Sequence, residues 1–368
     1  MSKYKKWLPL VTVALLLLVI LMPFITHSEV YNYLYNQTQD TVAHAKIISE
    51  IEDGQPVVNV LYLAQLIFLI PLGIVNSVLH IPALSLEIYF MFAMLIALIA
   101  WIYFISRKLK SGWLGVIIPV LVCTSLLGLF KNGMIFSIIN VYFVLIGAFY
   151  CMSQYLMYKE RTWLTASMVL FACFVMLHPS GLYLVPTSLL ALGLLLTLKL
   201  THKYYSKELF IITGIVFLIS LTSIPINYFH ASTASAISTV GRNTGNYLDY
   251  LFSWNFGVGL MILLAITAGG LFLYREHIQI GNQLKYMLVM LGCLAGSLAG
   301  GVVIGITSYP ERLMSDLAVV VAIITALLMA QLFNIPKHKA DLTILKYLAY
   351  FVIGVNSLYT LGVWVGCV

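Results

Sequence analysis

Charged side chains are scarce in this sequence. Lysine, arginine, aspartate and glutamate together make up 9% of the 368 residues, whereas hydrophobic residues make up 61%. A soluble globular protein has about 25% charged residues, so this chain has too few charges to cover a surface that faces water. The composition therefore predicts an integral membrane protein with almost no soluble part.

Cysteine is also sparse. The five cysteines all lie in apolar segments and form no CxxC pair, so we expect neither a disulfide framework nor a cysteine metal site. The net charge of +7 could suggest nucleic acid as a partner. However, the basic residues sit in short clusters between apolar runs, which is typical of cytoplasmic loops, and we expect no nucleic acid.

Long apolar runs recur along the whole chain. A helix needs about 20 apolar residues to cross the hydrocarbon core, so we expect an all-α fold, a single transmembrane bundle of about eleven spans over residues 1–368. No small-residue cleavage site follows the first run, which we interpret as an uncleaved span. The predicted spans are 7–25, 84–105, 112–130, 134–157, 162–177, 181–198, 208–226, 255–274, 286–307, 313–333 and 343–366. The spans 162–177 and 181–198 are short, and the sequence between them predicts a tight hairpin.

The apolar stretch 57–79 is ambiguous because it contains Asn59, Gln65, Pro71 and Asn76. It could cross the membrane or lie at the interface. If it lies at the interface and the N-terminus is cytoplasmic, 16 of the 20 basic residues are inside; if it crosses, only 6 are. If it crosses and the N-terminus is external, 14 are inside, but Lys3, Lys5 and Lys6 are then outside. The positive-inside rule therefore favours an interfacial helix.

This arrangement leaves two sizeable external loops, residues 26–83 and 227–254. In the first loop we expect a helix that ends at Gly54. One face of it has Asp40, His44, Ile47 and Ile51. The apolar members of that face would press it onto the membrane domain, so Asp40 and His44 would face the protein. The alternative is a surface acid that caps a helix beside an unrelated histidine.

Five other candidate residues lie at or near the predicted external side. Arg312 begins a late span and could bind a lipid phosphate in bidentate fashion, or it could only extend to the interface. Lys131 could neutralise a phosphate or be an exposed turn residue. His178 is a candidate site residue or a hairpin cap. Arg242, together with Asp249, could belong to a mobile lid or to an ordinary solvated loop.

No predicted span has a charged residue near its centre. Glu87 and Asp316 come closest, and both lie at external ends of their spans. Ion-coupled transporters usually need an intramembrane charge, so this pattern favours chemistry at the outer face.

Taken together, these residues resemble the GT-C superfamily of membrane glycosyltransferases. The resemblance covers about residues 1–200 and 300–335 and lies in four features found in the same order. These are Asp40, His44 and Gly54 after the first span; an interfacial helix before a span that ends in Arg107-Lys108-Leu109-Lys110; Lys159-Glu160-Arg161-Thr162-Trp163 followed by His178-Pro179; and Pro310-Glu311-Arg312.

The resemblance implies a polyprenyl-phosphate-linked sugar as donor and an active site on the external face of the cell membrane. Asp40 would act as general base on an acceptor hydroxyl, with His44 beside it. Arg312 and Lys131 would stabilise the departing phosphate, and the sugar would be transferred with inversion. A lipid, glycan or polymer of the cell envelope is the expected acceptor.

The chain departs from the family pattern beside Asp40, where many members have a second acid and this chain has Thr41 and Val42. A divalent metal ion (Mg or Mn) therefore remains open, with Glu29, Glu52 or Asp53 as ligands beside Asp40. The Trp-Trp-Asp signature is absent, so transfer of a whole oligosaccharide to asparagine is not expected. Two alternatives to an enzyme remain, namely a transporter or flippase for a lipid-linked sugar, and a structural membrane subunit.

Overall fold

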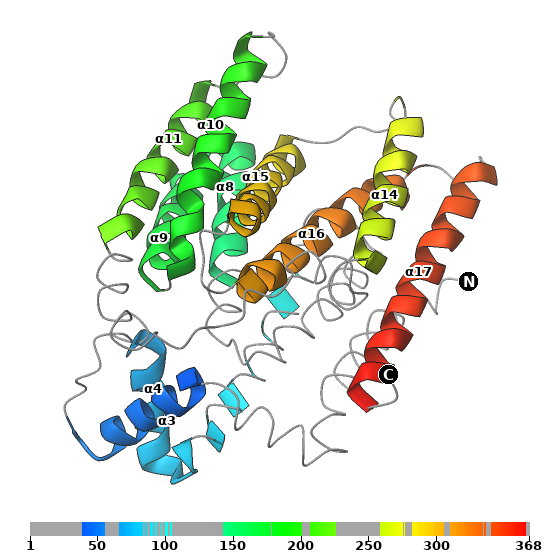
Figure 1. Cartoon of the computed structure of the whole chain (residues 1–368). Helices are drawn as coiled ribbons and strands as arrows, with labels where there is room; N and C mark the ends of the chain where they lie inside the picture. Colours follow the sequence, from blue (N-terminus) through cyan, green and yellow to red (C-terminus); the bar gives the residue numbers. More distant parts are fainter. Residues whose placement is uncertain are drawn as a thin grey trace. The chain divides into compact units, whose positions relative to one another are not determined.

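Every described element of this chain is a helix. The computed structural model describes residues 39–55, 66–83, 85–86, 143–177, 179–200, 207–225, 258–274, 282–304, 310–333 and 340–365, with single positions between 89 and 104 and at 276 and 335. Over these residues there are ten α-helices, one 3-10 helix and no strand (Figure 1). The all-α prediction is confirmed. The helices between residues 39 and 221 belong to one compact unit and those between 258 and 365 to another, and each unit is described by itself.

Two described helical segments are long and apolar enough to cross a membrane, Lys207–Pro225 and Leu284–Gly301. This does not match the prediction of about eleven spans. The predicted spans 7–25 and 112–130 lie outside the described residues, and several others are described only as shorter helices. A helix of 13 to 17 residues, the lengths of α8 (Ile146–Tyr158) and α9 (Arg161–Leu177), rises about 20–26 Å, less than the hydrocarbon thickness of about 30 Å.

The predicted hairpin between residues 162 and 198 is confirmed. Helix α9 ends at Leu177, the 3-10 helix η3 covers Pro179–Tyr183, and α10 covers Leu184–Leu200. Helix α11 (Lys207–Leu221) follows and packs against both α9 and α10 (Figure 1, green). The break in the apolar run therefore divides it into two helices joined by a single short turn.

A glycine at this turn allows the chain to pass very close to α9. A Cβ atom on Gly181 would lie 2.7 Å from the Cα of Val175 and 3.0 Å from its carbonyl oxygen. Because both are backbone atoms, no side-chain rotation could relieve the contact. The turn requires glycine for space.

The same unit is held together by aromatic and hydroxyl contacts. Phe149 of α8 packs edge-on against Phe171 of α9, with ring centroids 5.6 Å apart, and both side chains are fully buried. The Ser167 hydroxyl of α9 donates to the carbonyl of Ala148, at 2.9 Å. Such a bond suits an apolar interior because it leaves the buried hydroxyl group paired.

The starts of α9 and α11 meet the end of α8. Lys159 ends α8 in the left-handed conformation, with φ 61°, and its backbone N–H donates to the carbonyl of Tyr155. The Lys159 ammonium forms an ion pair with Glu208 at the start of α11. Since α9 begins at Arg161, α9 and α11 start at the same end of this unit.

The second unit is built around α16 (Pro310–Phe333). Helices α15 (Asn282–Ile304) and α14 (Val258–Leu273) both pack against α16, and α17 (Ala340–Val365) packs against α14 (Figure 1, yellow to red). Nearly every described side chain of α16 from Asp316 onward is buried or half-buried. Helix α16 is therefore the central helix of its unit.

Candidate functional site

The predicted helix of the first external loop is present as α3, Gln39–Glu52. It ends as the sequence indicated, since Gly54 takes a positive φ of 67° and its N–H donates to the carbonyl of Ile51. The N–H of Gln55 donates to the carbonyl of Glu50 and closes the last turn. Glycine suits this position because an L side chain rarely adopts the left-handed conformation.

One face of α3 is buried, and it contains the candidate histidine. His44 is 3% exposed and lies beside Ile47 and Ile48, which are fully buried. Lys46 and Ser49, on the other side, are exposed. His44 therefore faces the protein, as predicted. Asp40 lies on the same helix, one turn earlier; its side chain is outside the described set.

Helix α4 (Leu66–Leu79) packs against α3. A glycine allows the close approach, because a Cβ atom on Gly73 would lie 2.5 Å from the Cγ2 of Ile51 and 2.7 Å from its Cβ. The opposite side of α4 is apolar and exposed, and includes Ile74 and Val78. Residues 57–65 lie outside the described residues, so the interfacial placement of 57–79 stays a prediction.

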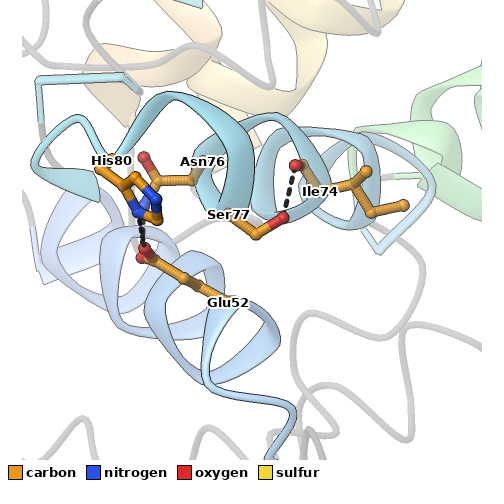
Figure 2. A network of polar contacts seen from close by, with 5 residues as sticks. All are labelled: Glu52, Ile74, Asn76, Ser77 and His80. Atoms are coloured by element: carbon orange, nitrogen blue, oxygen red, sulfur yellow. Dashed lines mark hydrogen bonds and ion pairs between the residues drawn. The ribbon is translucent and has the colours of Figure 1, made fainter.

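A polar cluster joins the ends of α3 and α4 (Figure 2). The Asn76 side-chain amide donates to one carboxylate oxygen of Glu52, at 2.5 Å, and the Nδ1 atom of His80 lies 3.6 Å from the other. His80 follows α4 in a left-handed conformation, with φ 51°. Sequence reasoning missed this cluster. The 24-residue separation of Glu52 and Asn76 gives no local pattern to detect it.

This geometry limits the metal hypothesis. The α-helix rises 1.5 Å per residue, so positions 40 and 52 of α3 are separated by about 18 Å along its axis. Metal–oxygen bonds are about 2.0–2.6 Å long. Neither Glu52 nor Asp53 can therefore share one ion with Asp40 on this helix, although both were candidate ligands. Within the described part of the chain, no group of three histidine, cysteine or acidic residues is placed to hold a metal ion.

The other predicted site residues are less completely placed. Arg312 lies in the first turn of α16, in the unit that does not contain α3, and its side chain is outside the described set. Glu29, Lys131, His178, Arg242 and Asp249 all lie outside the described residues. Their roles stay predictions.

One acidic residue was assigned no role from the sequence and is buried in the structure. Asp316 of α16 is 3% exposed, the most deeply buried acidic side chain among the described residues. From the sequence, it was placed at the external end of a span. Its spacing of four residues from Arg312 is the signal that could have identified it.

No protein-family model, curated protein or solved structure matches this chain.

Proposed function

We propose that this chain is a multispanning membrane glycosyltransferase that transfers a sugar from a polyprenyl-phosphate donor to an acceptor on the external face, with inversion. Helix α3 is the observation on which the proposal rests. This short helix has an acid and, four residues later, a histidine that is buried, and a glycine follows two residues beyond its end. A histidine on the exposed side of this helix, where Lys46 and Ser49 lie, would be in water.

The exposed apolar surface supports a membrane location. On α11, Ile211 and Leu218 are 51% and 63% exposed, while Ile212 and Val216 on the other side are buried. Water disfavours such a surface, but lipid tails are as apolar as these side chains. Our proposal keeps the N-terminus in the cytoplasm, about eleven crossings, and α4 lying at the outer interface with its apolar side toward lipid.

In the proposed reaction the Asp40 carboxylate takes the proton of the acceptor hydroxyl. The acceptor oxygen then attacks the anomeric carbon, the bond from that carbon to the phosphate oxygen breaks, and the polyprenyl phosphate leaves. Arg312 and Lys131 stabilise the charge that develops on the phosphate. His44, one turn from Asp40, helps to fix the position of the carboxylate, and the loop with Arg242 and Asp249 covers the site.

The variant Asp40→Asn tests this reaction. We expect sugar transfer by the purified protein in proteoliposomes to fall by about 10²–10⁴-fold, the usual contribution of a general base, while polyprenyl-phosphate binding stays within about twofold. Asp53→Asn is the matched control, because Asp53 is an exposed acid just beyond the other end of the same helix, and this variant should keep full activity. Equal activity of the two variants would contradict the assignment of Asp40.

The same experiment separates the transporter alternative. A flippase would move a lipid-linked sugar across the proteoliposome membrane without forming a glycosidic bond. Detection of that movement in wild-type protein, with no transfer to any lipid, glycan or polymer acceptor, would favour the flippase and reject the enzyme.

A further inference from the structure

Asp316 is an acid buried inside an apolar helix bundle. Its side chain is 3% exposed, and its neighbours Leu317, Ala318, Val319 and Val320 on α16 are also buried. An isolated charge in such surroundings is strongly disfavoured, so a buried carboxylate is normally paired or hydrogen-bonded. Asp316 does take part in a polar or electrostatic interaction.

Among the described residues, the two helices that pack most closely on α16 have few cations to offer. The sequence of α14 contains no charged residue, and that of α15 contains only Lys285. The connection from α15 to α16 is five residues long, so the end of α15 lies near the start of α16. Lys285 lies 19 residues before the end of α15, about 28 Å away along the helix axis, and is at the far end from Asp316.

A cation is present one turn earlier on α16 itself. Arg312 and Asp316 are four residues apart in the continuous helix Pro310–Phe333, and residues with this spacing lie on the same face. Glu311, the other acid in this part of α16, is adjacent to Arg312 in sequence and lies about 100° away around the helix. Asp316, but not Glu311, therefore has the position to hold the guanidinium.

We propose that Asp316 is a positioning residue, which pairs with Arg312 and fixes its guanidinium in the orientation that binds the donor phosphate. The phosphate ligand in this inference is taken from the proposed function, on which this part of the inference rests. A carboxylate that occupies part of the guanidinium fork leaves the remaining N–H groups aimed in one direction. Asp316 makes no contact with the sugar or the acceptor in this assignment.

The test measures binding of a sugar-free polyprenyl phosphate to the purified full-length protein in micelles. Asp316→Asn should weaken binding about tenfold, and Asp316→Glu should recover most of it because the carboxylate is retained. Arg312→Ala should weaken binding more. Adding Asp316→Asn to Arg312→Ala should then change binding less than twofold, since Asp316 acts through Arg312. Glu311→Gln is the matched control and should bind like wild type.

Thermal unfolding of the same variants tests the pairing without any ligand. The loss of melting temperature in the double variant should be clearly smaller than the sum of the two single losses. Additive losses would overturn the pairing. A tenfold effect of Asp316→Asn in the Arg312→Ala background, or equal effects of Glu311→Gln and Asp316→Asn, would overturn the positioning role. The melting temperatures could show the pairing while the wild-type protein binds no polyprenyl phosphate. That result would reject the proposed function and the phosphate ligand, but not the pairing of Asp316 with Arg312.

Discussion

Two regions of the same unit each have a close contact that only glycine allows. In one the glycine faces a side chain, and in the other it faces backbone atoms. In the α3–α4 pair, a Cβ atom on Gly73 would meet the side chain of Ile51. In the α9–η3–α10 hairpin, a Cβ atom on Gly181 would meet the backbone of Val175 and Phe174. A side chain can be shortened by mutation, whereas a backbone atom moves only if its helix moves.

The polar contacts of the two regions differ in the same way. Glu52 and His80 join α3 to α4 at an edge that water reaches, since the His80 side chain is 78% exposed. In the other region, the hydroxyl groups of Ser167, Thr187 and Ser188 are buried and donate to backbone carbonyls, as the Ser188 hydroxyl does to Leu184 at 2.5 Å. We therefore expect mutations at the α3–α4 contact to lower the free energy of unfolding only slightly. Mutations in the hairpin around η3 should lower it more, because its contacts involve backbone atoms.

The largest effect should come from Gly181→Ala. A Cβ atom 2.7 Å from the Cα of Val175 forces η3 away from α9, and we expect a loss of about 3 kcal/mol in the free energy of unfolding, the upper end for overpacking. Denaturant unfolding of the detergent-solubilised protein measures it. Val175→Ala in the same chain should give no rescue, because the clash is with the backbone. Full rescue by Val175→Ala would mean that side chains control this turn.

Gly73→Ala should have an intermediate effect, about 1–2 kcal/mol, and this effect should depend on its neighbour. The added methyl meets Cγ2 of Ile51 at 2.5 Å, although the alanine itself favours the helix by about 1 kcal/mol.

Ile51→Ala removes that Cγ2 atom but keeps the Cβ atom, 2.7 Å from the added methyl, so the rescue is partial. The double variant should then be more stable than the sum of the two single changes implies, by about 0.5–1 kcal/mol. If the loss of stability in the double variant equalled the sum of the two single losses, shortening Ile51 would not relieve the contact. Helices α3 and α4 would then move apart as rigid bodies, as expected for α9 and η3 in Gly181→Ala.

The sequence predicted local features of the fold well. Gly54 ended α3 because its position requires a positive φ, and the break near Gly181 divided a long apolar run into two helices. Both signals come from a few adjacent residues, where backbone sterics act. The burial of His44 was also predictable, because residues three and four apart on a helix share a face.

Features that depend on distant residues were not predicted. The cluster of Glu52, Asn76 and His80 requires α4 to fold back on α3, and nothing in either segment specifies that register. The sequence suggested Glu52 as a metal ligand because it is an acid near Asp40 in the chain. In the structure the two residues lie near opposite ends of α3, too far apart to bind one ion. Asp316 was placed by its distance from the predicted membrane centre. In the structure it is buried, and its helix α16 packs against α15 and α14, which the sequence of α16 alone does not show.

The smallest effect should come from Asn76→Leu, which tests whether the polar cluster stabilises the α3–α4 pair. Asn76 is 1% exposed, and its Oδ1 atom has no hydrogen-bond partner among the described residues. Leucine loses the bond to the Glu52 carboxylate, worth about 1.5–3 kcal/mol, and removes a buried, unpaired carbonyl that costs about 1–3 kcal/mol.

Glu52 is half-buried and can regain water, so we expect a net change within about 0.5 kcal/mol in denaturant unfolding. Asn76→Ala is the control, since it loses the bond and also leaves a cavity, and should cost about 1–2 kcal/mol. If leucine cost as much as alanine, about 1–2 kcal/mol, the cavity would not account for the loss, and the hydrogen bond to Glu52 would be the main contact holding α3 to α4. The pair would then be as tightly specified as the hairpin around η3.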